Sequence, residues 1–268
     1  SAKKATLDQI SNQMTLLENC EIDDQQGNRV YGDKILLGFK DKSLESLKVI
    51  SNGIILSQNS GYEKIDDKRQ LVENEDVLKG ETIFASLNND KIENIEILGM
   101  ASTLIHLYND SLYDGINEVS GDKIILNIKN DSAQKLIAEG GTIGRYTPNE
   151  SNEKVQEDIN YTSDRVEFEV DTKISEMYGG VKIIHDNMDL SAAHINVNWE
   201  TNILEAFSNN PFDDEEINRP ILVEDNREPM TGNTMVYNIK SRKGKILMGE
   251  SQVQENVFMG SQITSVTD

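Results

Sequence analysis

Apolar and polar residues alternate along three similar segments of the chain, Gly32–Phe39, Gly80–Leu87 and Gly121–Ile128. Their first residues are separated by intervals of 48 and 41 residues. Alternation with a period of two places every second side chain on one face of a β-strand. Intervals of this length are typical of a repeated supersecondary unit. The three segments therefore predict one strand each in a repeating β architecture.

A polar turn and a second, returning strand follow each of these segments. The turns are expected at 40–43, 88–90 and 129–131. The apolar residues of the returning strands are Leu47, Val49, Ile95, Ile97, Leu136 and Ala138. These strands are expected to end near Gly53, Gly99 and Gly140, because glycine adopts a positive φ at little cost. The predicted repeat is strand, turn, strand, turn.

The same alternation continues later in the chain, in 166–170, 195–199 and 235–239. Near the start, Met14–Ile22 is also interpreted as a strand, although its apolar spacing fits a helix as well. An alternation of this kind is typical of antiparallel sheet with one face in water.

Three intervals have the composition of loops: Tyr62–Asp76, Thr147–Asn160 and Ser208–Pro229. The second is the best candidate for a boundary, which predicts domains at 1–150 and 151–268. Strand pairs of this kind bury their apolar face only by stacking. The fold class predicted is therefore all-β, an elongated antiparallel β-jellyroll of stacked strand–turn–strand repeats. Its interior is expected to be aliphatic, because aromatic residues make up 6% of the chain.

Charge and composition exclude several functions. The formal net charge of −21 disfavours nucleic acid as a partner, because binding to phosphates requires clustered cations. Cys20 is the only cysteine, so the chain has no internal disulfide and no cysteine-rich zinc site. Cys20 could bond to a partner or be a small buried hydrophobe.

Few residues offer catalytic or metal-binding chemistry. His106, His185 and His194 have no ligand spacing and are expected to be solvated or hydrogen-bonded strand residues. The acidic run 213–216 lacks the pattern of a calcium loop, and 140–144 lacks the Lys-Ser/Thr of a phosphate-binding loop. The first is interpreted as a solvated loop and the second as a turn. No metal, no cofactor and no enzymatic activity are expected.

Several short motifs resemble a known family. Gly32–Phe39, Gly115–Ile128 and Gly140–Pro148 are similar to the OstA-like repeats of LptA-type lipopolysaccharide transport proteins. Motifs of the second half resemble the periplasmic domain of the lipopolysaccharide-assembly protein LptD. They are Tyr161–Arg165, Met188–Ala192, Met230–Gly232, Tyr237–Gly244 and Phe258–Ile263.

The resemblance implies a β-jellyroll, or "β-taco", whose open interior holds the acyl chains of lipopolysaccharide. It implies a periplasmic location, associated with the outer membrane in the full-length protein. The partners implied are lipopolysaccharide and other jellyroll transport proteins, joined through their edge strands. If the chain is an excised domain, an outer-membrane barrel in cis is a further partner.

The candidate lipid-binding groove is the set of apolar residues on the predicted inner face. These residues are Ile35, Leu37, Phe39, Ile83, Leu87, Ile95, Ile97, Ile124, Leu126, Ile128, Val166, Phe168, Val170, Ile195, Val197, Trp199, Met235, Tyr237 and Ile239. The alternation by itself favours an ordinary closed core, whereas the resemblance favours a groove. Two further functions stay open: a soluble LptA-like bridge or shuttle subunit, and an extracellular β-solenoid that binds or cleaves polysaccharide.

Overall fold

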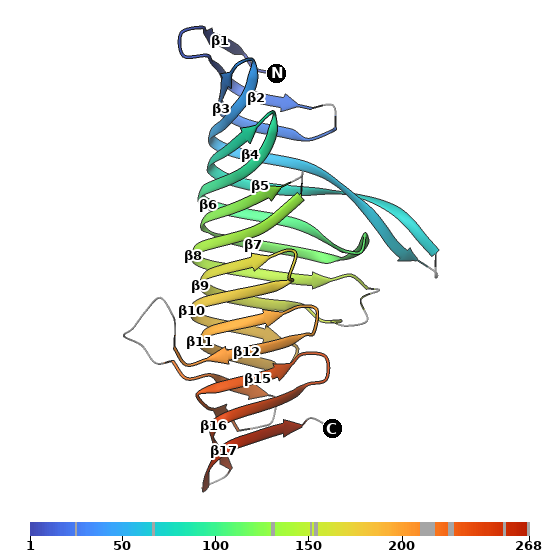
Figure 1. Cartoon of the computed structure of the whole chain (residues 1–268), viewed down its shortest axis with the longest axis vertical. Coiled ribbons are helices and arrows are strands. Elements are labelled where there is room, and N and C mark those ends of the chain that lie inside the picture. The colour runs from blue at the N-terminus through green and yellow to red at the C-terminus, as the bar shows by residue number, and fades with distance from the viewer. Residues whose placement is uncertain are drawn as a thin grey trace. The chain divides into compact units, whose positions relative to one another are not determined.

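The computed structural model describes residues 1–24, 26–65, 68–129, 132–150, 152, 155–209, 218–224, 228–253 and 256–266. Every regular element among them is a β-strand (Figure 1). The strands are β1 (Lys4–Asp8), β2 (Gln13–Asp23), β3 (Arg29–Lys40), β4 (Ser43–Ile65), β5 (Lys68–Asn88), β6 (Lys91–Asn109), β7 (Leu112–Lys129), β8 (Ser132–Pro148), β9 (Ile159–Glu169), β10 (Ile174–His185), β11 (Met188–Asn198), β12 (Ile203–Phe207), β13 (Ile221–Glu224), β14 (Met230–Thr231), β15 (Thr234–Asn238), β16 (Lys243–Val253) and β17 (Asn256–Val266).

Strands that are consecutive in the chain pair with each other, as β2–β3, β3–β4, β4–β5, β5–β6 and β6–β7 do. These ladders are antiparallel, and the parallel contact between β4 and β7 is a single bridge from Tyr62 to Leu112. The predicted all-β, antiparallel jellyroll of strand–turn–strand repeats is therefore confirmed. The strand predicted at Met14–Ile22 is confirmed as β2.

The chain divides into two compact units, unit 1 (Ser1–Gly140) and unit 2 (Gly141–Asp268). The division falls within β8. The domains 1–150 and 151–268 stay a prediction.

Two-residue turns close several hairpins of unit 1. Asp41 and Lys42 join β3 to β4 with φ of 50° and 73°, and Asn89 and Asp90 join β5 to β6 with φ of 50° and 61°. Two consecutive left-handed residues are typical of a type I′ turn, whose twist matches that of the paired strands. These two turns lie where the sequence predicts them. The third falls between β7 and β8, and its residues 130 and 131 lie outside the described residues.

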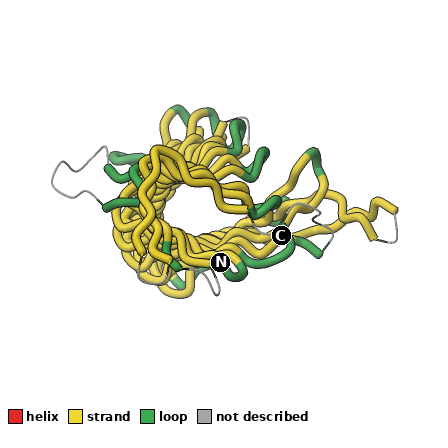
Figure 2. The backbone as a smooth tube through the Cα atoms, turned by 90° about the horizontal axis from the view of Figure 1, so that it is seen from below, coloured by secondary structure: helices red, strands yellow, loops and turns green. Residues whose placement is uncertain are grey.

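The prediction that the returning strands end near Gly53, Gly99 and Gly140 is wrong, because β4, β6 and β8 continue through these positions. The ladder of β6 shifts register there, between Leu98 and Ala101. Two consecutive residues have left-handed φ at each such point, for example Gly99 (73°) and Met100 (47°). A bulge of this kind bends a strand without ending it. We call this bend the corner; Figure 2 shows the bends of the strands from below.

The corner divides each long strand into two arms. The first arm contains the repeats described above, such as 82–88 of β5 and 123–129 of β7. The second arm lies on the other side of the corner and includes residues 101–109 of β6 and 112–120 of β7. In unit 2 the corner of β10 lies at Gly179 and Gly180, whose φ values are 74° and 52°.

Acidic residues of the neighbouring strands pack against the corner glycines. A Cβ atom added to Gly99 would lie 2.5 Å from Oε2 of Glu81, and one added to Gly140 would lie 2.5 Å from Oδ2 of Asp122. Glycine is required here for two reasons, the left-handed backbone and the closeness of the carboxylate.

The predicted loop Tyr62–Asp76 is wrong, because β4 and β5 continue as a paired hairpin whose last pair is Ile65 with Lys68. We call this part of the hairpin, 57–65 with 68–76, the ribbon. The ribbon extends beyond the neighbouring strands of unit 1 (Figure 1). Most side chains of the ribbon's outer part are exposed, so it needs no apolar alternation, and its sequence therefore has the composition of a loop.

The other two predicted loops are partly correct. Between Pro148 at the end of β8 and Ile159 at the start of β9 there is no regular element among the described residues. The interval Ser208–Pro229 is wrong as a continuous loop, because β13 lies within it. The acidic run 213–216 lies outside the described residues.

Candidate functional site

One continuous row of aliphatic side chains lies beside the corner on the first arm of unit 1. Ile35, Val49, Ile83, Ile97 and Ile124 are paired in register across five strands, and all five are fully buried. Because directly opposed residues share one face of a sheet, this row is the innermost part of the apolar interior.

Burial decreases along the same face toward the hairpin turns. Ala85 and Leu126, two positions beyond the fully buried row, are still buried. At the next alternate position, Phe39, Leu87 and Ile128 are only half-buried. The first arm is therefore sealed at the corner and partly open at its outer end.

The second arm of unit 1 differs in chemistry. One buried row, Ile55, Leu78, Thr103 and Val119, lies in register next to the corner. The buried hydroxyl of Thr103 has no hydrogen-bond partner among the described residues. At the next position of the same face, Ser57, Asp76 and Asn117 are polar, whereas Ile105 is aliphatic.

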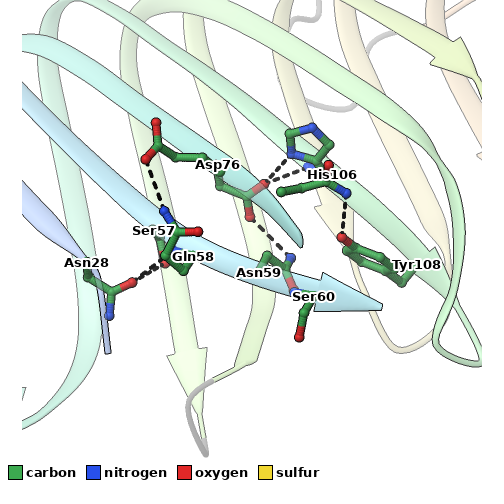
Figure 3. Close-up of polar contacts among 10 residues, drawn as sticks. Asn28, Ser57, Gln58, Asn59, Ser60, Asp76, His106 and Tyr108 are labelled. Carbon is green, nitrogen blue, oxygen red and sulfur yellow. Dashed lines mark hydrogen bonds and ion pairs between the residues drawn. The ribbon is translucent and has the colours of Figure 1, made fainter. Parts of the chain in front are cut away.

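Asp76 holds the base of the ribbon, at the point where β5 separates from β6. The last pair of the two strands is Val77 with Leu104. Beyond it, Oδ1 of Asp76 accepts hydrogen bonds from the backbone N–H of His106 at 2.8 Å and lies 2.9 Å from its Nδ1 (Figure 3). Asn59 donates to Oδ2 of the same carboxylate at 3.3 Å. A side chain thus takes over the backbone hydrogen bond that the separation removes.

The ribbon also packs against the end of the β6–β7 hairpin. Tyr108 accepts a hydrogen bond from Asn74 at 2.8 Å, and its ring occupies the space beside Gly61, where a Cβ would lie 2.3 Å from it. The rings of Tyr108 and Tyr113 are 5.9 Å apart. Burial raises the pKa of both phenols, so they are neutral hydrogen-bonding groups at physiological pH.

Most of the predicted groove residues of unit 2 are also buried. Of the nineteen predicted groove residues in the whole chain, twelve are buried and seven are half-buried. Six of the seven half-buried ones lie toward the ends of the first arm, and Leu37 lies two positions beyond the fully buried Ile35. The seven are Leu37, Phe39, Leu87, Ile128, Phe168, Val170 and Trp199. That these residues contact a lipid stays a prediction.

Besides the ion pair of Arg242 with Asp186, two contacts between described residues join the arms of unit 2. Tyr146 lies on the second arm of β8, and Trp199 directly follows the first arm of β11; their ring centroids are 5.9 Å apart. The indole N–H of Trp199 donates to Ser175 at 2.7 Å, and Asn152 donates to the hydroxyl of Tyr146 at 3.0 Å. Both rings are thus held in place by a hydrogen bond.

The second contact is polar. The hydroxyl of Tyr237, on β15 of the first arm, donates to Oε1 of Glu224, on β13 of the second arm, at 3.4 Å. Both residues are buried, and Glu224 is the most deeply buried carboxylate of the described residues. Tyr146, Glu224 and Ser175 were not predicted, because the contact between arms depends on the bend at the corner.

His185 lies on the second arm between these two contacts. The residues Ile159, His185, Met188 and Glu224 are opposed in register across β9, β10, β11 and β13. His185 is 7% exposed, and its Nε2 has no hydrogen-bond partner among the described residues. Burial lowers the pKa of its imidazole below the ordinary 6.5, so the ring is neutral at pH 7.

The other two histidines are hydrogen-bonded, as the sequence predicts. His106 contacts Asp76, and Nε2 of His194 contacts Oε2 of Glu176. His194 is also stacked between Tyr178 and Phe207, with centroids 4.7 Å and 5.2 Å away. For His185 the prediction of a solvated or hydrogen-bonded side chain is wrong.

Cys20 is buried, and its thiol lies 3.5 Å from the carbonyl oxygen of Asp33. In the described part of the chain, no group of three or more His, Cys, Asp or Glu residues is arranged to hold a metal ion. None of the described segments forms a helix that could cross a membrane.

Comparisons with known proteins identify a structural likeness. No family model matches the chain, and no curated protein matches it in sequence. Among solved structures, the chain is similar to LptH, the LptA-homologous periplasmic component of the lipopolysaccharide transport device from Pseudomonas aeruginosa. The two share 12% identity over 52% of this chain and 88% of LptH, with a TM-score of 0.39.

Proposed function

We propose that the chain is a lipopolysaccharide-transport domain that holds acyl chains in its apolar interior and passes the lipid toward the outer membrane. The observation that carries this proposal is the decrease in burial along the first arm of unit 1. Ile83 is fully buried, whereas Leu87, on the same face and strand, is half-buried. A row of aliphatic side chains that is partly open at one side is what a lipid-binding interior requires.

The physical chemistry of this interior suits a carrier. Each methylene group that leaves water contributes about 0.8 kcal/mol, so a few chains contribute substantial affinity. The hydrophobic effect is non-directional, and a row made of Ile, Leu and Val does not fix the position of a chain along it. A half-open row therefore binds chains and still allows them to move.

The location and partners proposed follow from the sequence resemblance. They are the periplasm, lipopolysaccharide, and other jellyroll transport proteins that pair with edge strands, with an outer-membrane barrel in cis if the chain is part of an LptD-type protein. A free-standing, LptA-like bridge or shuttle subunit would use the same interior. Without such a barrel the same chain would release its lipid to a partner protein.

Binding of polysaccharide receives less support from the described surface. Sugars stack on exposed faces of aromatic rings, but the rings of Tyr178, His194 and Phe207 are stacked on one another. Both faces of the central His194 ring are therefore covered by its neighbours.

Site-specific photo-crosslinking tests the proposal. A photoreactive residue at Leu87 should capture lipopolysaccharide during transport or after incubation with the purified chain. Ser86 is the matched control, because it is the preceding residue of the same strand, is also half-buried, and faces the opposite side. Capture of equal amounts at both positions would contradict a lipid-binding interior.

A further inference from the structure

The inference concerns the polar atoms buried inside unit 2. The row beside the corner on the first arm of unit 1 is aliphatic, but the second arm of unit 2 buries His185 and Glu224 within one register row. A polar group removed from water without a hydrogen bond costs roughly 1–3 kcal/mol. Each unpaired buried group in a folded protein therefore requires an explanation, such as a bound water or a ligand.

Among the described buried side chains of unit 2, two polar atoms lack a hydrogen-bond partner, Nε2 of His185 and Oγ1 of Thr142. Nε2 of His185 makes no hydrogen bond to any described residue, although only 7% of the residue is exposed to solvent. The ring is neutral, so Nε2 is a donor in one tautomer and an acceptor in the other. A hydroxyl group satisfies either tautomer, because it both donates and accepts.

The surroundings of His185 connect it to the place where the two arms meet. The contact of Tyr146 with Trp199 joins the arms on one side, and the hydrogen bond of Tyr237 to Glu224 joins them on the other. Met188 separates His185 from Glu224 along the row. A molecule held between the arms of unit 2 would therefore lie between an aromatic contact and a hydrogen-bonded contact, with Nε2 of His185 as a polar atom to bind.

We propose that Nε2 of His185 is a binding point for a hydroxyl group carried by the bound amphiphile, positioned between the two contacts that join the arms. This inference rests on the proposed function and adds a specific polar recognition to it. The apolar rows hold chains of any kind, whereas His185 distinguishes a chain that carries a hydroxyl group from one that does not.

Competition binding with the full chain tests this proposal. Tetradecanoic acid and 3-hydroxytetradecanoic acid, which differ by one hydroxyl group, would each displace a fluorescent fatty acid from the wild type and from three variants. For each protein we take the ratio of its affinities for the two acids. The two acids differ in solubility, but this difference is the same for every protein and cancels when the ratios of wild type and variants are compared.

The preference for the hydroxy acid should be about five-fold greater in the wild type than in His185→Leu. A factor of about five is the contribution of one hydrogen bond to affinity. His185→Gln retains a polar terminal group and should keep most of the preference. Met188→Leu, a volume-conserving change beside His185, should leave the ratio unchanged. Binding of tetradecanoic acid by each variant shows that it is folded.

Equal ratios in the wild type and His185→Leu would overturn the proposal, and would mean that a bound water satisfies Nε2. If neither acid displaces the fluorescent probe from the wild type, the proposed function itself fails, and this inference with it.

Discussion

The aromatic rings of Trp199 and Tyr146 are in contact, with centroids 5.9 Å apart and planes inclined by 53°, although the two residues belong to opposite arms of unit 2. A tilted arrangement of this kind is favourable for aromatic pairs. The contact joins segments that the hydrogen bonds of the sheet do not join directly. It therefore stabilises the bent form of unit 2 in particular.

A double-mutant cycle should measure this contact. Trp199→Leu and Tyr146→Leu each remove one ring, and their effects on the free energy of unfolding should be coupled by about 1 kcal/mol. Tyr146→Phe is the control, because it keeps the ring and removes only the hydroxyl that Asn152 contacts. Additive effects of the two leucine substitutions in denaturant unfolding would show that the rings do not stabilise each other.

Substitutions at the corner should separate backbone strain from close packing. Gly140 and Gly141 both have left-handed φ, of 82° and 64°. A Cβ at Gly140 would lie 2.6 Å from the Cβ of Asp122, whereas one at Gly141 would have no atom within 4 Å. Gly141→Ala should cost only the strain, about 1 kcal/mol. Gly140→Ala should cost roughly 2 kcal/mol more, because Asp122 or the bend must move.

Thermal unfolding monitored by circular dichroism measures the two variants under identical conditions. Equal losses of stability would mean that the carboxylate of Asp122 moves aside freely. If Gly140→Ala costs more than Gly141→Ala, a double variant with Asp122→Gly should recover this packing cost and leave the strain.

The first arm could be predicted from the sequence because its chemistry is periodic. Ile83, Ala85 and Leu87 face one side, and both the alternation and the following turn at Asn89 are local properties of the chain. The corner was missed because a left-handed glycine such as Gly99 has the same local signature in a turn as in a bulge. Only the register with the neighbouring strand distinguishes the two.

The contacts within the interior could not be predicted, because they depend on how the arms approach each other. Trp199 and Tyr146 are 53 positions apart in the chain, and no sequence pattern relates them. The ribbon was missed for a different reason. Its pair Lys64 with Arg69 has no apolar face, and a strand in water on both sides has no alternation to detect.

Asp76 should prove essential to the base of the ribbon. Asp76→Ala leaves the backbone N–H and the imidazole of His106 without their acceptor and should destabilise this region by about 2 kcal/mol. Asp76→Asn keeps an oxygen at the same place and should cost about half as much. Hydrogen exchange at the His106 amide measures the effect directly, and should be faster in the alanine variant. Unchanged exchange at His106 would contradict the assigned role of Asp76.

The buried His185 should make stability depend on pH in a specific window. Burial lowers the pKa of the imidazole, an effect that Arg242 strengthens and that Asp186 and Glu157 oppose. The folded protein therefore binds a proton at His185 less readily than the unfolded chain, whose pKa is about 6.5. Stability is then lost as the pH falls below 6.5 toward the lowered pKa, by at most about 1.4 kcal/mol per pH unit.

His185→Leu should lack this contribution and lose less stability over the same range. Urea unfolding of both proteins at several pH values between 7.5 and 5 measures the difference, since the many carboxylates titrate equally in the two and their effect cancels. His194→Leu is not a suitable control, because His194 contacts Glu176. Met188→Leu is suitable, because it changes the packing beside His185 without removing a titratable group, and its pH dependence should match that of the wild type. Parallel curves for the wild type and His185→Leu would show that the imidazole takes up a proton as easily in the folded chain as in the unfolded one.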